Sequence, residues 1–374
     1  MARETGDTGC KFLGVSMKWV ALILLVLQTV AAVIVVRYSR LTTDANGDRY
    51  LNTTAVAMAE VVKLLAGAFI VWSENGYSLA KTGRTLSAST LQSPVPMLQV
   101  AVPAILYTFQ NNLIFVALSN LSGAVYQVAY QLKILTTALL SVILLRKQLT
   151  ATKWLALFTL TGGVALIQFP TDGATPAELP GKGNQVVGLV AVLSACFTSA
   201  CAGVYFEKVL KQTPISIWVR NIQLALYGTV LAIIGAFWTD GEIIRTKGFF
   251  QGYNAVVWSA VLLQALGGLI VAAVLKYADN ILKCFGNALS IVLSCILSWW
   301  LLNDFQPSAL FGVGVAAVLL ATFLYSSDVP LSALWGARTG GADAKAGVEF
   351  RVVASTDEDY DATSPRQASP TAHE

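Results

Sequence analysis

Residues 85–145 read TLSASTLQSPVPMLQVAVPAILYTFQNNLIFVALSNLSGAVYQVAYQLKILTTALLSVILL, and these 61 residues contain a single charged side chain, Lys133. A helix that spans a bilayer needs about 20 mainly apolar residues, so the stretch is long enough for two spans. A lysine at the bilayer centre costs about 2.5–3.5 kcal/mol on insertion scales. Because a chain keeps such a residue where it faces a polar cavity or binds an anion, Lys133 is the first candidate functional residue.

The composition of the whole chain agrees with this stretch. Of its 374 residues, 55% are hydrophobic and only 12% are charged, whereas a soluble domain carries roughly 25% charged residues. The sequence therefore predicts an all-α polytopic membrane protein, with the lipid bilayer as a partner. Its lysines and arginines separate apolar runs and do not cluster, so no nucleic-acid partner is expected.

Metal, cofactor and enzyme chemistry have no signature in the sequence. The chain has one histidine, His373, and its five cysteines show no C-x-x-C spacing, so no metal site and no cofactor are expected. There is also no phosphate-binding loop and no nucleophile–base motif. We therefore do not expect an enzyme.

Ten apolar segments predict ten transmembrane helices. They cover residues 18–36, 52–73, 95–118, 122–145, 153–169, 185–206, 216–238, 254–275, 281–302 and 306–326. The expected organisation is a cytosolic N-terminus, a first five-helix repeat, a lumenal linker, a second five-helix repeat and a disordered cytosolic tail. These parts cover residues 1–17, 18–172, 173–184, 185–327 and 328–374.

A weak internal repeat suggests how the two halves are related. Leu132-Lys133 precedes Ala138-Leu139 just as Leu282-Lys283 precedes Ala288-Leu289, at an offset of 150 residues. Each half has five spans, an odd number, so the halves are expected to insert in opposite orientations, an arrangement found in transporters. The alternative is chance similarity between two helices rich in Leu and Ala. Thirteen lysines and arginines on one side against six on the other place both termini in the cytosol.

Polar residues in the second and third spans have two interpretations. Glu60 and Lys63 lie three residues apart and share a helix face, either as a structural ion pair or as part of a site. Gln110, Asn111 and Asn112 interrupt the third span, with Tyr107 one turn before Asn111. The amides either hydrogen-bond between helices or bind a base edge or sugar hydroxyl.

Aromatic and basic residues point to an anionic ligand. Tyr126 and Tyr130 precede Lys133 on roughly one helix face, where they either pack or offer a base a stacking surface. At the end of the eighth span, Lys276 is better placed to reach inward, whereas Lys283 is expected to extend to the interface. The residues alone therefore favour a transporter for a polar organic anion.

Six longer motifs carry a family resemblance. They are Gln110–Asn112, Ala117–Asn120, Tyr126–Thr137, Gly203–Lys208, Trp218–Gln223 and Lys276–Lys283. Together they resemble the nucleotide-sugar transporter family of the drug/metabolite transporter superfamily, over about residues 17–327. Three further motifs are most similar to UDP-N-acetylglucosamine and UDP-galactose transporters: Gly248–Asn254, Leu263–Gly268 and Asp304–Pro307. CMP-sialic acid transporters resemble the chain too, but have a tyrosine where it has Ala225.

The resemblance implies a multi-pass Golgi antiporter that imports a nucleotide sugar into the lumen in exchange for a nucleoside monophosphate. We expect UDP-N-acetylglucosamine and UMP; the alternatives are UDP-galactose, CMP-sialic acid, another phosphorylated metabolite, or a membrane scaffold that presents the tail. Assembly as a homo-oligomer or with a glycosyltransferase stays open.

The same resemblance implies which residues form the site. The residues expected to line the nucleotide pocket are Tyr107, Gln110, Asn111, Tyr126, Lys133, Ser199 and Asn221. Lys63 and Lys276 are expected to face the phosphates or the sugar, with Glu60 nearby, and Gly203 and Gln264 lie in matched motifs. Where the family has a glycine-aromatic pair, this chain has Ala200-Cys201, a departure that puts the sugar selectivity in doubt.

Overall fold

In the computed structural model, the described residues are 11–12, 15–39, 47–90, 94–168, 184–302 and 308–327. They form twelve helices and one short antiparallel pair of strands. The helices are α1 (Met17–Ser39), α2 (Asn52–Glu74), α3 (Leu79–Thr90), α4 (Pro94–Asn120), α5 (Gly123–Tyr130), α6 (Leu132–Leu145), α7 (Ala151–Ile167), α8 (Gln185–Gln212), α9 (Ile217–Lys247), α10 (Ala255–Tyr277), α11 (Asn280–Leu302) and α12 (Ala309–Ser326). The strands are β1 (Lys11–Phe12) and β2 (Val15–Ser16).

The helices confirm a polytopic membrane protein. Among the described residues, nine spans are long and apolar enough to cross a membrane, with α5 and α6 together forming one of them. The tenth apolar segment is α7, a shorter helix of 17 residues. Of the expected segment 1–17 the structure describes residues 11–12 and 15–17, and of the expected linker 173–184 it describes residue 184 alone. The expected tail, 328–374, lies wholly outside the described residues.

Polar caps explain where several spans begin. The side chain of Asn184 accepts hydrogen bonds from the first backbone N–H groups of α8, and Asn254 and Ser308 do the same for α10 and α12. Such caps satisfy donors that have no partner within the helix. The apolar run therefore sets the length of a span, and the polar residue before it sets its start.

The structure differs from the ten expected segments in three places. The fourth span is divided at Gln131 into α5 and α6. A short helix that the apolar pattern does not show, α3, follows α2, and Thr82 is its one buried residue. In addition, α9 continues past its apolar part to Lys247, with a kink at Asp240.

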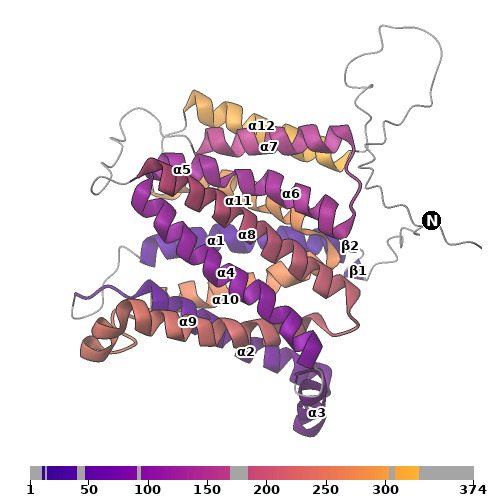
Figure 1. The fold of residues 1–374 in the computed structure, drawn as a ribbon, viewed down its shortest axis with the longest axis vertical. Coiled ribbons are helices and arrows are strands. Elements are labelled where there is room, and N and C mark those ends of the chain that lie inside the picture. The colour runs from indigo at the N-terminus through magenta and orange to yellow at the C-terminus, as the bar shows by residue number, and fades with distance from the viewer. Residues whose placement is uncertain are drawn as a thin grey trace, which may run out of the picture. The chain divides into compact units, whose positions relative to one another are not determined.

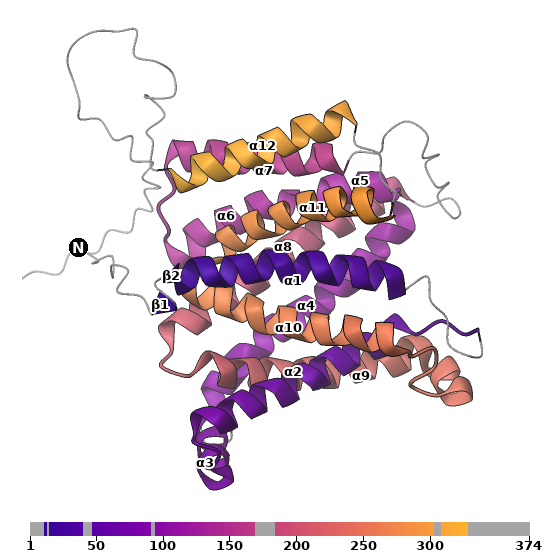
Figure 2. The same ribbon diagram turned by 180° about the vertical axis from the view of Figure 1, so that it is seen from behind.

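Figures 1 and 2 show the long helices in two layers. One layer holds α4, α5, α6, α8 and α9, and the other holds α1, α2, α10 and α11. At one end α2 packs against α9, and at the other α7 packs against α12. The α7–α12 contact is close because Gly163 and Gly314 face each other: a Cβ built on Gly314 would lie 2.8 Å from the carbonyl oxygen of Gly163.

The contacts repeat between the two halves of the chain. Helix α4 of the first half packs on α8 of the second, and α10 of the second half packs on α1 of the first. Likewise α6 packs on α8, and α11 packs on α1. The pairs α2–α9 and α7–α12 each join a helix of the first half to the helix at the same place in the second half. A pseudo-two-fold axis produces this reciprocal pattern, and five crossings in each half make the repeats inverted.

The alternating spans define two sides. We call the side that holds Met17, the first residue of α1, and Ser326, the last residue of α12, the terminal face. In Figure 2, β1, β2 and α3 also lie on this side. Because the spans alternate, α6, α8 and α10 also end there, and α11 begins there. The other side is called the opposite face.

Candidate functional site

A cavity of about 440 Å³ lies between α5, α6, α7 and α11. Two basic residues line it, Lys133 from α6 and Lys283 from α11, and we call it the lysine cavity. Aromatic and amide groups complete the polar lining, including Tyr126, Tyr130 and Asn287. The cavity therefore combines positive charge, aromatic rings and hydrogen-bonding amides.

Tyr130 connects the residues on one wall of the lysine cavity. Its hydroxyl accepts a hydrogen bond from Gln110 Nε2 at 3.0 Å and one from Lys133 Nζ at 3.3 Å. Its ring stacks on that of Tyr126, with centroids 5.5 Å apart and an interplanar angle of 21°. Three of the expected site residues are therefore held together by a fourth residue, and the paired rings offer a flat surface to a ligand.

Neither Lys133 nor Lys283 forms an ion pair with a residue that the structure describes. The two lysines occupy corresponding positions in the two repeats, 150 residues apart. Unpaired cations in a largely apolar bundle are costly, and an anionic ligand removes that cost. The lysine cavity can therefore hold a group with about two negative charges.

Other expected residues lie on α8, α9 and α4. Ser199 and Asn221 are buried, and neither amide atom of Asn221 has a hydrogen-bond partner among the described residues. Gly203 allows α8 to approach α11, because a Cβ there would lie 2.6 Å from Asn280 Nδ2. Asn111 is exposed on α4. The unsatisfied amide of Asn221 is costly unless a ligand or water binds it.

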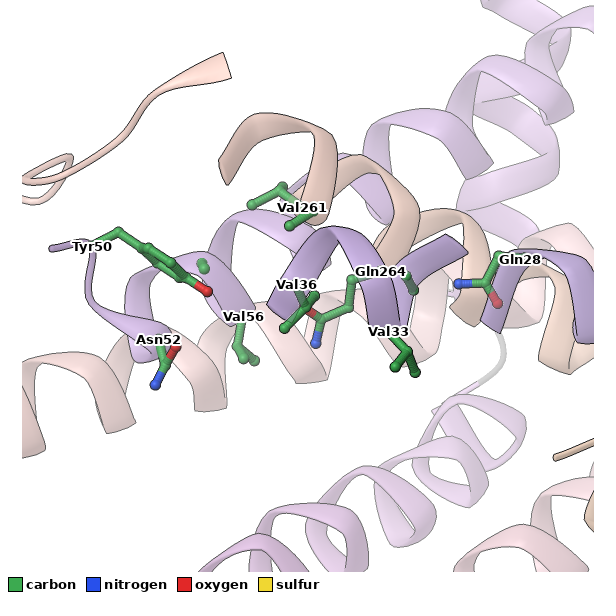
Figure 3. A pocket seen from close by; sticks show the side chains of 11 residues that line it. Gln28, Val33, Val36, Tyr50, Asn52, Val56, Val261 and Gln264 are labelled. Atoms are coloured by element: carbon green, nitrogen blue, oxygen red, sulfur yellow. The ribbon is translucent and has the colours of Figure 1, made fainter. Parts of the chain in front are cut away.

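A second pocket, of about 380 Å³, lies between α1, α2 and α10 (Figure 3). Its polar lining includes Gln28, Asn52 and Gln264, and we call it the amide pocket. Beside it, the carboxylate of Glu60 pairs with Lys63 Nζ at 2.6 Å. Lys63 lies against Gly268 of α10, where a built Cβ would be 2.7 Å from Lys63 Cδ, and Glu60 lies against Gly228 of α9.

A polar network closes the terminal face. Glu207, on α8, is fully buried and forms ion pairs with Lys147 and Lys211, each at 2.9 Å. It also accepts a hydrogen bond of 2.9 Å from the backbone N–H of Asn280, and Lys147 lies 3.3 Å from Asp279. The network joins the end of α6, α8 and the junction between α10 and α11.

Apolar contacts reinforce this closure. Phe206 and Leu210 of α8 pack with Ala272 and Leu275 of α10. Lys276 donates a hydrogen bond of 2.6 Å to the carbonyl oxygen of Leu210, so in this conformation it binds the end of α8. The symmetry-related pairs α1–α4 and α1–α6 have no comparable contact among the described helices. The protein is therefore closed toward its terminal face.

Sequence reasoning did not select three residues that the structure brings to these pockets. Lys283 was expected at the interface, yet it lines the lysine cavity, whereas Lys276 does not. Asn287 lies one turn beyond Lys283, a spacing that could have indicated it. Gln28 could have been selected from the sequence, because it is a polar amide within the apolar first span.

Comparisons with known proteins agree with the fold and with the expected family. The nucleotide-sugar transporter family model matches residues 14–326. A solved crystal structure superposes with a TM-score of 0.59 at 13% identity, covering 83% of this chain and 96% of that one. At this identity the likeness supports the fold alone.

Curated relatives are similar over most of the chain. A human UDP-N-acetylglucosamine transporter is 50% identical, covering 84% of this chain and 96% of the relative. A Caenorhabditis elegans UDP-N-acetylglucosamine/UDP-N-acetylgalactosamine transporter is 47% identical, covering 84% and 94%. A human UDP-galactose translocator is 44% identical, covering 83% and 77%. The chain belongs to the nucleotide-sugar transporter family.

Proposed function

We propose that this protein is an antiporter that moves UDP-N-acetylglucosamine in one direction across the Golgi membrane and UMP in the other. The observation that carries the proposal is the lysine cavity, where two unpaired lysines face a stacked tyrosine pair. Phosphate groups suit the lysines, and a uracil ring suits the tyrosines. Relatives named for UDP-N-acetylglucosamine support the choice of sugar.

The orientation belongs to the same proposal. We assign the terminal face to the cytosol, because the surplus of lysine and arginine lies on that side. In this assignment the network around Glu207 is the cytosolic gate, and the described conformation gives access from the lumen. A nucleotide monophosphate would enter this conformation, and a nucleotide sugar would enter the reciprocal one.

The residues have separate roles. Lys133 and Lys283 neutralise phosphate, Tyr126 and Tyr130 stack on the base, and Gln110 fixes the hydroxyl of Tyr130. Asn221 supplies donor and acceptor atoms that have no partner among the described residues. The assignment of Ser199, Asn111 and Tyr107 to the nucleotide pocket remains part of the proposal.

Exchange in proteoliposomes tests the proposal. Purified protein is reconstituted with internal UMP, internal CMP or no nucleotide, and uptake of labelled UDP-N-acetylglucosamine, UDP-galactose and CMP-sialic acid is measured. We expect uptake of UDP-N-acetylglucosamine that internal UMP accelerates. Faster uptake with internal CMP, or equal uptake without any nucleotide, would contradict the proposal.

Two controls separate the alternative functions. Free UMP should compete with the substrate, whereas a carrier of phosphorylated sugars without a nucleotide should not respond to it. Deleting residues 331–374 should leave the flux unchanged, whereas a scaffold that acts through its tail would lose function. Assembly with a second copy or with a glycosyltransferase is tested separately, by cross-linking in native membranes.

A further inference from the structure

Helix α3 differs from the spans in both length and composition. It has 12 residues, carries many polar side chains and is not among the helices apolar enough to cross a membrane. Figures 1 and 2 show it beyond the end of α2, running across the direction of the spans. Because α3 follows α2 at the terminal face, it lies where the bilayer meets water on that side.

Contacts with two spans fix the orientation of α3. Before it, the chain reverses through Gly76 and Tyr77, whose φ angles of 66° and 58° are left-handed. The ring of Tyr77 packs edge-on against Trp72 of α2, with centroids 5.0 Å apart. Near the other end, the carbonyl oxygen of Ser89 accepts a hydrogen bond of 2.8 Å from Gln223 Nε2 of α9. The helix is held at both ends, so the faces it presents are defined.

The side chains of α3 divide into three faces. Thr82 is buried and faces the helices that α3 contacts, which are α2, α4 and α9. Leu79 and Leu86 are seven residues apart and share a second face, where Leu79 is 78% exposed. Lys81 and Arg84 are exposed. Each cation lies two residues from one of the leucines, which places it about 200° around the helix, on the opposite side.

The apolar face of α3 continues the lipid-facing surface of α2. Leu65 and Phe69 are exposed on α2, one turn apart. The ring of Phe69 packs on Trp72, and Trp72 packs on the exposed Tyr77, two residues before Leu79. Aromatic side chains of this kind lie at the level of lipid headgroups. An exposed apolar row therefore runs from the bilayer to Leu79, and lipid acyl chains cover it.

The basic face of α3 has no protein counter-charge among the described residues. Lys81 and Arg84 form no ion pair with any of them. They are three residues apart, so their charges lie side by side on the helix surface. The preceding acidic residue, Glu74, is exposed in the last turn of α2. An arginine and a lysine together bind phosphate oxygens well, and the apolar face holds both cations at the depth of the lipid phosphates.

We propose that α3 is an interfacial helix that binds the headgroup of an anionic phospholipid in the leaflet at the terminal face. Leu79 and Leu86 enter the boundary of the acyl chains, and Lys81 and Arg84 bind the phosphate. Because α3 is fixed to α2 and α9, the bound lipid anchors this end of the bundle at the interface. Lipid binding of this kind is independent of the transported ligand.

A titration with phosphatidylserine tests the basic face. The full chain is purified in detergent, and the Kd of the first bound phosphatidylserine is determined by native mass spectrometry. Each cation at an anionic lipid surface contributes a factor of about five. We therefore expect Lys81→Gln and Arg84→Gln each to raise this Kd about fivefold, and the double variant to raise it about 30-fold. The Kd for phosphatidylcholine should change less than twofold.

Two control variants belong to this titration. Arg84→Lys keeps the charge and should keep most of the affinity. Arg245→Gln removes an exposed arginine near the end of α9, on the opposite face, and should change neither Kd.

The depth of two spin labels tests the apolar face. Single cysteines, Leu79→Cys and Lys81→Cys, are labelled in a chain whose native cysteines are replaced, and the protein is placed in nanodiscs that contain phosphatidylserine. The label at position 79 should collide more often with oxygen, which concentrates in the acyl region. The label at position 81 should collide more often with a water-soluble nickel complex.

Each measurement can overturn the assignment. An unchanged Kd for phosphatidylserine in the double variant, or an equal loss in Arg245→Gln, would show that α3 does not bind the headgroup. Preference for the nickel complex at both labelled positions would show that α3 lies in water, where its exposed face would be open to a soluble partner instead of lipid.

Discussion

Replacing Glu207 by glutamine is expected to open the terminal face. Glu207 is fully buried and carries the negative charge that holds Lys147 and Lys211, each at 2.9 Å. Glutamine has the same shape and can still accept a hydrogen bond from the N–H of Asn280, so the variant should fold. The change removes the attraction between the ends of α6 and α8.

The size of this effect follows from where the two lysines paired with Glu207 lie and from how exposed they are. Lys211 follows Glu207 by one turn on α8, so this ion pair lies within one helix and is not broken when the face opens. The Lys147 side chain is 22% exposed against a fully buried carboxylate, and a charge-assisted bond of this kind contributes about 1.5–3 kcal/mol. Since glutamine retains a neutral bond, the net loss is about 1–2 kcal/mol. The open form should therefore become about 5- to 30-fold more populated.

Thiol labelling measures this population. Cys284 lines the lysine cavity and is only 7% exposed, so a membrane-impermeant reagent applied to the terminal face should reach it slowly in wild type. In a background where the other cysteines are replaced, labelling of Glu207→Gln from that face should accelerate by a factor in the range above. The replaced positions are Cys10, Cys196, Cys201 and Cys295.

A matched variant controls for the loss of a carboxylate. Glu242 is exposed near the end of α9 and forms no ion pair with a described residue, so Glu242→Gln should label like wild type. An unchanged labelling rate in a folded Glu207→Gln protein would refute the reasoning, because the network would then not hold the face closed.

Three further changes test the site and the fold. Lys133→Ala should lower exchange more than 100-fold while the protein remains monodisperse in size-exclusion chromatography; normal exchange would show that this lysine is not central. Tyr130→Phe removes the hydroxyl that binds Gln110 and Lys133, so the KM for UMP should rise about five- to tenfold, and an unchanged KM would remove Tyr130 from the site. Gly314→Leu places side-chain atoms where a Cβ already lies 2.7 Å from Ile167 Cγ1, so the melting temperature in detergent should fall by several degrees; a stable variant would show that the α7–α12 contact can relax.

The number of spans and their symmetry could be predicted from sequence because the bilayer imposes a length on every apolar run. The repeat around Lys133 and Lys283 predicted inverted halves, and the reciprocal helix contacts agree with that prediction. The α3 helix was not predicted, because its sequence is rich in polar residues and contains no long apolar run. The division at Gln131 was missed for a related reason: the apolar pattern continues through it.

The roles of individual lysines were harder to predict. Lys276 and Lys283 both lie near the end of a span, where sequence position alone does not say which one turns inward. The structure places Lys283 in the cavity, while Lys276 binds the carbonyl oxygen of Leu210. Glu207 likewise gave no signal, because its burial depends on two other segments, one around Lys147 and one around Asp279 and Asn280.

The two unpaired lysines also give a physical reason for exchange. An empty carrier that changed its open side would move Lys133 and Lys283 through an apolar bundle without a counter-ion, at a cost of several kcal/mol. A monophosphate carries about −1.5 to −2 charges at pH 7, which nearly balances the two lysines, and the diphosphate of a sugar nucleotide carries a similar charge. Each ligand therefore removes the same barrier when bound. Because both crossings neutralise the same two charges, the exchange should be nearly electroneutral, and an imposed membrane potential should change its rate little.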